Sequence, residues 1–138
     1  MKHAFLDTNI LLDFAMEKRE FHEEAVEIFN LRFSDELKIY CSTHSIATLH
    51  YFIRKEMNEA ASKKYISQLM SMIESIDVTK HTLESAVVSN FSDFEDAIQF
   101  FSAGSNSQVQ FIITNDKTGF RNSTIAVYSS QEFLKKYF

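Results

Sequence analysis

Short apolar runs of β-type residues alternate with longer segments of helical periodicity along the whole of this chain. The strongest run, VQFIIT at residues 109–114, has the β-branched and apolar character of a strand that is buried on both faces of a parallel sheet. Strands that alternate with helices predict an open parallel sheet with helices on both faces. We therefore expect an α/β fold, a three-layer α/β/α sandwich with a mostly parallel central sheet of about four to five strands.

The bounds of the expected elements come from periodicity and polar clusters, because the chain has no proline and two glycines. We expect strands at residues 3–7, 38–42, 75–78, 109–114 and 124–128. A first helix follows Asp7, with an N-cap at Thr8 or Asn9, and a final helix is capped by Ser130. The remaining helices are expected at residues 21–33, 43–54, 58–73, 82–90 and 93–103.

The size of the chain suits one domain over residues 1–138, since 45% of its residues are hydrophobic and no linker or repeat interrupts them. A single cysteine, Cys41, excludes an internal disulfide and favours a reducing compartment. Asp7 and Asp13 interrupt the apolar N-terminal stretch, and no run of about eighteen apolar residues exists. We expect a cytoplasmic protein with no targeting segment and no membrane contact.

The formal net charge of −5 argues against a broad basic face for nucleic acid. Any attraction for RNA must then be local, although each basic residue taken alone is more often a solvated surface charge. The candidate phosphate contacts are Lys18, Arg19, Arg54, Lys55, Lys63, Lys64, Lys117 and Arg121.

Acidic residues follow the ends of two predicted strands. Asp7 closes the first strand and Asp116 lies just beyond the strand at 109–114, so both belong to the carboxyl edge of the sheet, where open α/β sheets bind ligands. Asp93 and Asp96 stand three residues apart at the start of a helix, hence on one face of it. Clustered carboxylates are the ligands that Mg²⁺ or Mn²⁺ requires, whereas each acid alone is more simply a helix cap or a turn residue.

The order and spacing of three motifs give the chain a resemblance to the PIN domain family, which includes VapC-like toxins and PilT N-terminus-type ribonucleases. FLDTNILLD (residues 5–13) resembles the opening motif of the family. DFEDAIQFFSA (93–103) resembles its third acidic motif, and FIITNDKTGF (111–120) resembles its fourth. The resemblance extends over essentially the whole chain.

This resemblance implies a set of roles at the matching positions. The implied metal ligands and catalytic residues are Asp7, Asp96 and Asp116, with Asp93 as an extra ligand or a nearby supporting acid. Thr8 or Asn9 would orient Asp7, and Thr114 would support the fourth motif.

The chain departs from the family pattern at two positions. Thr48 stands where the second motif usually carries a glutamate, and Gly119 stands where an acid often precedes the phenylalanine. Glu56 lies two turns beyond Thr48, roughly 12 Å away, and Glu95 should point about 100° around its helix from Asp96. With so few carboxylates, one weakly bound ion of Mg²⁺ or Mn²⁺ is expected in place of two.

Other chemistries lack their signatures. The five histidines show no paired metal spacing, and the chain has neither a nucleophile elbow nor a glycine-rich phosphate loop. A haloacid-dehalogenase-like phosphotransferase would need an aspartate where Asn9 stands.

Two functions stay open at this point. The first is a metal-dependent endoribonuclease with an RNA substrate. In many members of the family this activity is that of a toxin in a toxin–antitoxin pair, which implies an antitoxin protein as a partner and a homodimer. The alternative is a degenerate domain, catalytically weak or inactive, that acts as an RNA- or protein-binding module, and Thr48 is its main support.

Overall fold

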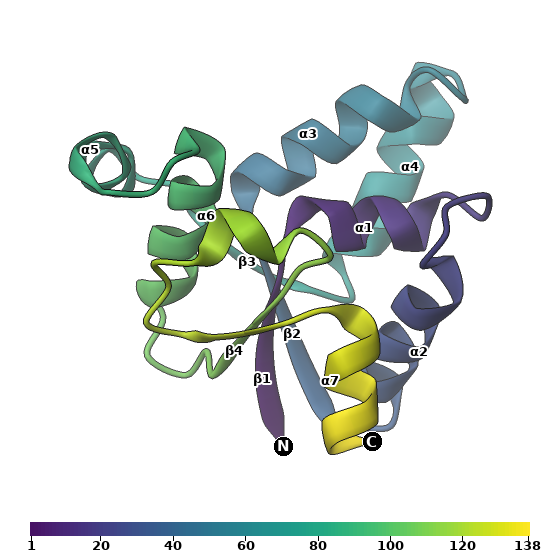
Figure 1. The fold of residues 1–138 in the computed structure, drawn as a ribbon. Coiled ribbons are helices and arrows are strands. Elements are labelled where there is room, and N and C mark those ends of the chain that lie inside the picture. Colours follow the sequence, from purple (N-terminus) through teal and green to yellow (C-terminus); the bar gives the residue numbers. More distant parts are fainter.

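A computed structural model describes residues 1–138 and shows one five-stranded sheet in which every neighbouring pair of strands is parallel. The strand order is β3-β2-β1-β4-β5, so β1 lies at the centre (Figure 1). The strands are β1 (Lys2–Leu6), β2 (Leu37–Ser42), β3 (Glu74–Ile76), β4 (Phe111–Ile113) and β5 (Ala126–Tyr128). The connection reverses direction beside β1, which places the functional edge of the sheet at the carboxyl ends of β1 and β4.

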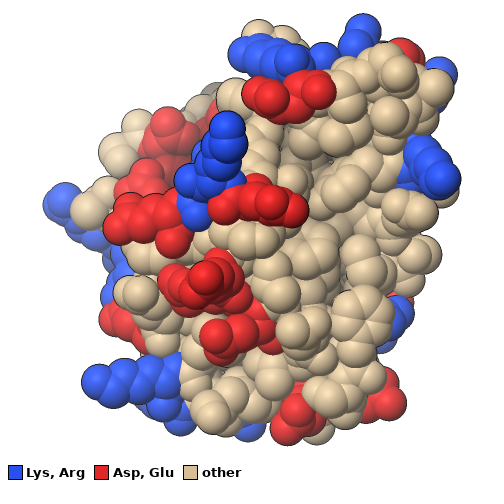
Figure 2. Space-filling model, turned by 90° about the vertical axis from the view of Figure 1, so that its right-hand side faces the viewer, with Lys and Arg blue, Asp and Glu red and all other residues tan.

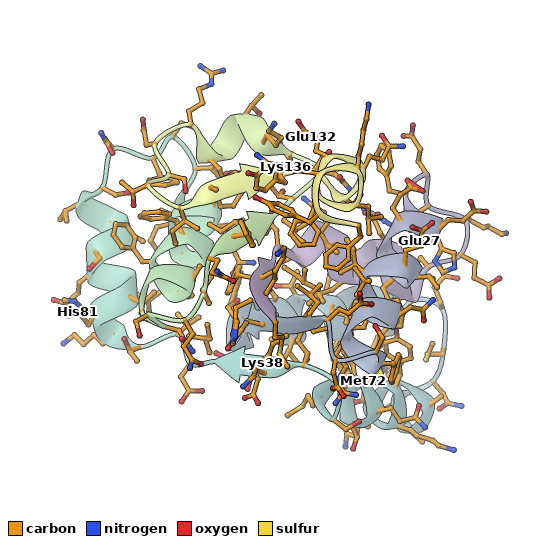
Figure 3. The ribbon with its side chains drawn as sticks, turned by 90° about the horizontal axis from the view of Figure 1, so that it is seen from below. Glu27, Lys38, Met72, His81, Glu132 and Lys136 are labelled. Carbon is orange, nitrogen blue, oxygen red and sulfur yellow. The ribbon has the colours of Figure 1, made fainter.

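Seven α-helices and one 3₁₀ helix connect the strands. They are α1 (Thr8–Ala15), α2 (His22–Phe33), α3 (Thr43–Ile53), α4 (Glu59–Met70), α5 (Lys80–Val88), α6 (Phe94–Gly104), η1 (Lys117–Phe120) and α7 (Ser130–Tyr137). Helices α1, α2 and α7 cover one face of the sheet and α6 the other, with α5 packed outside α6 (Figure 1). Seen from below, His81 on α5 and Glu27 on α2 lie at opposite ends of the molecule (Figure 3). The expected three-layer parallel α/β fold is confirmed.

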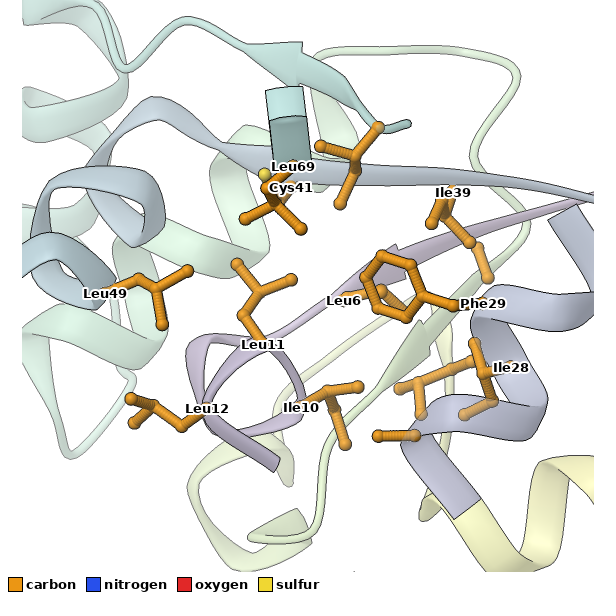
Figure 4. Close-up of a cluster of buried hydrophobic side chains, with 14 of the residues drawn as sticks. Leu6, Ile10, Leu11, Leu12, Ile28, Phe29, Ile39, Cys41, Leu49 and Leu69 are labelled. Atoms are coloured by element: carbon orange, nitrogen blue, oxygen red, sulfur yellow. The ribbon is translucent and has the colours of Figure 1, made fainter. Parts of the chain in front are cut away.

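The larger hydrophobic core lies between the sheet and the helices α1, α2, α3, α4 and α7 (Figure 4). Leu6 of β1, Ile10 and Leu11 of α1, and Phe29 of α2 are fully or almost fully buried there. Burial of a side chain of this size contributes roughly 1.5–3 kcal/mol. A smaller cluster on the opposite face joins the sheet to α6. None of the helices has both the length and the apolar character needed to cross a membrane.

Two expected helix caps are wrong by one residue. The N-cap of α1 is Asp7, whose carboxylate accepts a hydrogen bond from the Thr8 backbone, so Thr8 already belongs to the helix. The N-cap of α7 is Ser129, because its hydroxyl accepts from the Glu132 backbone while the Glu132 carboxylate accepts from the Ser129 backbone. This reciprocal capping box satisfies two backbone donors that would otherwise lack partners.

Strand β4 is shorter than the expected run at 109–114. Val109 donates to the Asn106 carbonyl in a turn, and strand pairing with β5 begins at Phe111. The apolar pattern is longer than the strand because Val109 packs on the smaller core cluster without belonging to the ladder.

Candidate functional site

The first predicted acid, Asp7, is held at the carboxyl edge of the sheet by four donors. Its Oδ1 accepts from the Thr8 backbone at 2.8 Å and from Gln99 Nε2 at 3.1 Å. Its Oδ2 accepts from Thr114 Oγ1 at 2.8 Å and from Asn9 Nδ2 at 3.3 Å. The residue is 6% exposed, so these bonds replace the water that an ionised group requires. Asp7 therefore has one fixed orientation.

Thr114 links the two acids that follow neighbouring strands. Leu6 of β1 pairs with Ile113 of β4, so Asp7 and Thr114 leave the sheet side by side. The Thr114 hydroxyl donates to Asp7 and accepts from the Asp116 backbone at 3.1 Å. One buried hydroxyl thus sets the position of the loop that carries Asp116 relative to Asp7.

Burial, with a smaller contribution from the repulsion between neighbouring acids, raises the pKa values of Asp7 and Asp96. Burial raises the pKa of Asp7 more than its hydrogen bonds lower it, and the charge of Asp116 adds to the increase. The pKa of Asp96 is raised to about 7, first by burial and then by the negative charges of Asp7, Asp93, Asp116 and Glu95. A cation bound among them would relieve this repulsion.

Asp7, Asp96 and Asp116 line a single cavity of about 240 Å³. They come from the end of β1, the first turn of α6 and the loop after β4. Asp93 does not line this cavity; it is the N-cap of α6 and accepts from the Asp96 backbone at 3.0 Å. It lies instead in a neighbouring hollow of about 630 Å³ that Asp96 and Asp116 also line. Three of the four predicted acids therefore share a cavity, and the fourth is next to it.

Both departures from the family pattern affect this cavity. Thr48, on α3, forms part of its wall, where a glutamate would add a carboxylate. A Cβ at Gly119 would lie 1.9 Å from Asp96 Oδ2, so the absence of a side chain makes room for the Asp96 carboxylate. Glu95, which was expected to point away from the site, is among the residues that line the cavity, but its side chain is 73% exposed and lies 4.0 Å from His44 Nε2.

Gln99 is a site residue that the sequence analysis missed. It is 2% exposed, and its Nε2 lies within hydrogen-bonding distance of Asp7, Thr8 and Ser45. Its Oε1 accepts from Ser42 Oγ at 2.6 Å. The available signal was its spacing, because a residue three positions after Asp96 lies on the same face of the helix.

A second missed constellation lies beside the first. Asp13 is 3% exposed and accepts from Arg19 Nε at 2.7 Å and from Asn115 Nδ2 at 3.0 Å. The Asn115 backbone in turn donates to Asn9 Oδ1 at 3.2 Å. Asn9 consequently connects the cradle of Asp7 to the Asp13 group.

The residues fit a partly hydrated ion better than a closed metal cage. As the side chains stand, no group of three or more His, Cys, Asp or Glu residues could hold a metal ion by itself. Asp7, Asp96 and Asp116 nevertheless line one cavity, where burial and the neighbouring acids raise the pKa values of Asp7 and Asp96. Mg²⁺ commonly binds through one or two carboxylates and keeps several waters. Carboxylate oxygens of this kind suit a hard divalent cation that keeps most of its waters.

Two sequence comparisons identify proteins that are similar to this chain. The sequence profile of the PIN domain matches residues 3–118. Ribonuclease VapC1 of Aquifex aeolicus (strain VF5) is 25% identical over 139 residues, which cover 97% of this chain and 94% of that protein.

Solved structures share the fold. A toxin–antitoxin complex from Klebsiella pneumoniae contains a chain that matches with a TM-score of 0.69 and 18% identity, covering 92% of this chain and 97% of that one. DNA-bound VapBC from Salmonella typhimurium matches with a TM-score of 0.68 and 20% identity, covering 94% of this chain and 99% of that one.

Proposed function

This chain belongs to the PIN domain family, and from that membership we propose that it is a divalent-metal-dependent endoribonuclease, the toxin of a toxin–antitoxin pair. The observation that carries the proposal is the cavity shared by Asp7, Asp96 and Asp116. The relative from Aquifex aeolicus is named a ribonuclease, and the matched Klebsiella structure is a toxin–antitoxin complex.

The proposed chemistry assigns each acid a distinct task. A bound Mg²⁺ or Mn²⁺ would supply an ionisable water and neutralise charge on the phosphate, so that hydrolysis leaves a 3′ hydroxyl. Asp7 offers a carboxylate fixed by four hydrogen bonds, which limits reorganisation when a ligand binds. Asp96 retains a proton until the pH approaches its pKa of about 7 and then adds a second charge. Asp116, hydrogen-bonded by Thr118 at 2.8 Å, completes the set from the β4 loop.

Metal affinity should be low, because Thr48 leaves the α3 wall of the cavity without a carboxylate. Fewer negative ligands neutralise a dication less completely. We therefore propose one weakly bound ion. Asp93, in the adjoining hollow, supports Asp96 by capping its helix.

The partners follow from the same proposal. RNA is the substrate, an antitoxin protein is the inhibitor, and the toxin is a homodimer in the cytoplasm. On α3, Phe52, which is 37% exposed, lines the cavity, and its neighbour Tyr51 is 62% exposed; the two offer apolar surface for such a protein partner.

The test is cleavage of a mixed RNA pool by the native protein, Asp7→Asn, Thr48→Glu and the control Asp77→Asn, each with Mn²⁺, Mg²⁺ or EDTA. Asp77 is an exposed acid outside the cavity. We expect metal-dependent cleavage by the native protein and the control, loss in Asp7→Asn, and stronger metal binding in Thr48→Glu. Equal cleavage by the native protein and Asp7→Asn would refute the assignment of the site.

Thr48 favours a second candidate, a catalytically weak module that binds RNA or protein. Cleavage that is absent in the native protein and present in Thr48→Glu would identify a nuclease scaffold that lacks one ligand. Binding of RNA without cleavage by any of the four proteins would establish the binding module.

A further inference from the structure

Two arginines line depressions that adjoin the acid cavity. A hollow of about 370 Å³ is lined by Arg19 together with Asn9, Asp13 and Asp116. The hollow of about 630 Å³ is lined by Arg121 together with Asp96 and Asp116. Asp116 also lines the acid cavity, so the three depressions meet at this residue.

Arg19 is an oriented cation with unused donors. Its Nε donates to the buried Asp13 at 2.7 Å, and Asn115 holds the other oxygen of Asp13. The two terminal nitrogens of Arg19 make no hydrogen bond and no ion pair, and the side chain is 39% exposed. A guanidinium fixed through Nε presents its terminal nitrogens as a fork, the geometry that binds phosphate oxygens.

Arg121 is the corresponding cation of the larger hollow. It is exposed and directly follows η1. It forms no ion pair, although Asp93, Asp96 and Asp116 line the same hollow. That hollow has no hydrophobic lining residue, which suits a hydrated phosphodiester backbone better than an apolar ligand.

The distribution of charge on the surface leaves few cationic side chains near the acid cavity. Acidic side chains gather on the face shown in Figure 2 and basic ones are scattered around them, without a continuous basic surface. Arg19 and Arg121 are the only Lys or Arg residues that line the three depressions. Within these depressions, a polyanion that approaches the acid cavity therefore finds cationic contacts only at these two points.

We propose that the backbone of the RNA substrate crosses the site over Asp116, with one flanking phosphate bound by Arg19 and another, on the far side of the scissile bond, bound by Arg121. This inference rests on the proposed function. It assigns Arg19 a substrate contact in addition to its neutralisation of Asp13, and it gives the RNA a defined path between two hollows.

The test measures how the affinity for a fluorescent, mixed-sequence, single-stranded RNA depends on salt in EDTA, where no cleavage occurs. The variants are Arg19→Gln and Arg121→Gln, and the matched control is Arg54→Gln. Arg54 also donates through Nε to a carboxylate, that of Glu59, but it lines none of the three depressions. Each lost phosphate contact should reduce the slope of log affinity against log salt by about 0.7, which is about fivefold in affinity at 0.1 M salt.

A structural effect of Arg19→Gln must be separated from a lost contact, because the substitution leaves Asp13 buried without its ion pair. The double variant Arg19→Gln/Asp13→Asn replaces that unpaired charge by a neutral amide pair, and its slope should fall by the same amount. Slopes of the Arg19 and Arg121 variants equal to that of Arg54→Gln would overturn the inference, as would a native protein that binds no RNA. A native protein that binds RNA but never cuts it would refute only the nuclease proposal.

Discussion

Asp96 is an acid whose ionisation depends strongly on its surroundings, since burial and then four nearby acids raise its pKa to about 7. Its pKa in the unfolded chain is near 3.8. At pH values between these two pKa values, the native state therefore keeps a proton on Asp96 that the unfolded state has released. Protonation of Asp96 thus stabilises the native state relative to the unfolded state. Burial of Asp7 acts in the same direction.

The sign of this linkage predicts a loss of stability with rising pH in the metal-free protein. The stability contributed by protonated Asp96 is fully present below about pH 4, and it is lost as the pH rises through about 7. Urea unfolding at about pH 5 and pH 8 in EDTA should give a lower free energy of unfolding at the higher pH. Asp96→Asn should reduce the difference, while the exposed control Asp77→Asn should preserve it. A native protein that gains stability over this interval would contradict the assignment.

Gly119 permits the observed position of Asp96, because a Cβ there would lie 1.9 Å from Asp96 Oδ2. Gly119→Ala should therefore destabilise the metal-free protein by about 1–3 kcal/mol, as overpacking does. The same change in an Asp96→Ala background should cost far less, since the obstructing carboxylate is gone. Urea unfolding of the four proteins in this cycle measures the coupling. Additive effects would show that the two residues do not interact.

At the scale of elements, α7 depends on its first turn. Ser129 and Glu132 form a capping box, and Lys117 of η1 bonds the same carboxylate at 2.9 Å. The Ser129 backbone, followed by Lys117, lowers the pKa of Glu132 to about 2. One exposed acid thus connects the 3₁₀ helix of the β4 loop to the final helix; Glu132 and Lys136 project from this helix in Figure 3.

Removing the cap should weaken this connection. Ser129→Ala should lower the free energy of unfolding by about 1 kcal/mol. Gln131→Ala, an exposed position in the same turn, should change it by less than about 0.5 kcal/mol. Thermal or urea unfolding distinguishes the two variants, and equal effects would show that the hydroxyl is dispensable.

The elements themselves were largely predictable from local pattern. Strand ends located Asp7 and Asp116, and a helix start located Asp96. The cap of α7 was also in the sequence, since Ser129 and not Ser130 has a glutamate three residues later. Gln99 was not predictable in its role, because its partners Asp7 and Thr8 lie 92 and 91 positions away. The Arg19–Asp13 pair likewise depends on tertiary contact with Asn115.

At the scale of the molecule, metal binding should stabilise the native fold, because the ion interacts with an assembled cavity and not with separated acids of the unfolded chain. An ion at 100 times its dissociation constant adds about 2.7 kcal/mol. Mn²⁺ should raise the melting temperature of the native protein more at about pH 8 than at pH 6, since protons compete at Asp96. The melting temperature of Asp7→Asn should not rise with Mn²⁺. A rise equal to that of the native protein would show that the ion binds at another site.

The position of Cys41 has a practical consequence. The side chain is fully buried in the larger core, and burial raises the pKa of its thiol to about 12. Maleimides react with exposed thiolates, so the folded protein should be inert to them at neutral pH. A single cysteine introduced at an exposed position such as Glu56 would then carry a fluorophore stoichiometrically, without any change to the native core. The chain is therefore suited to fluorescence measurements with one label at a chosen surface position.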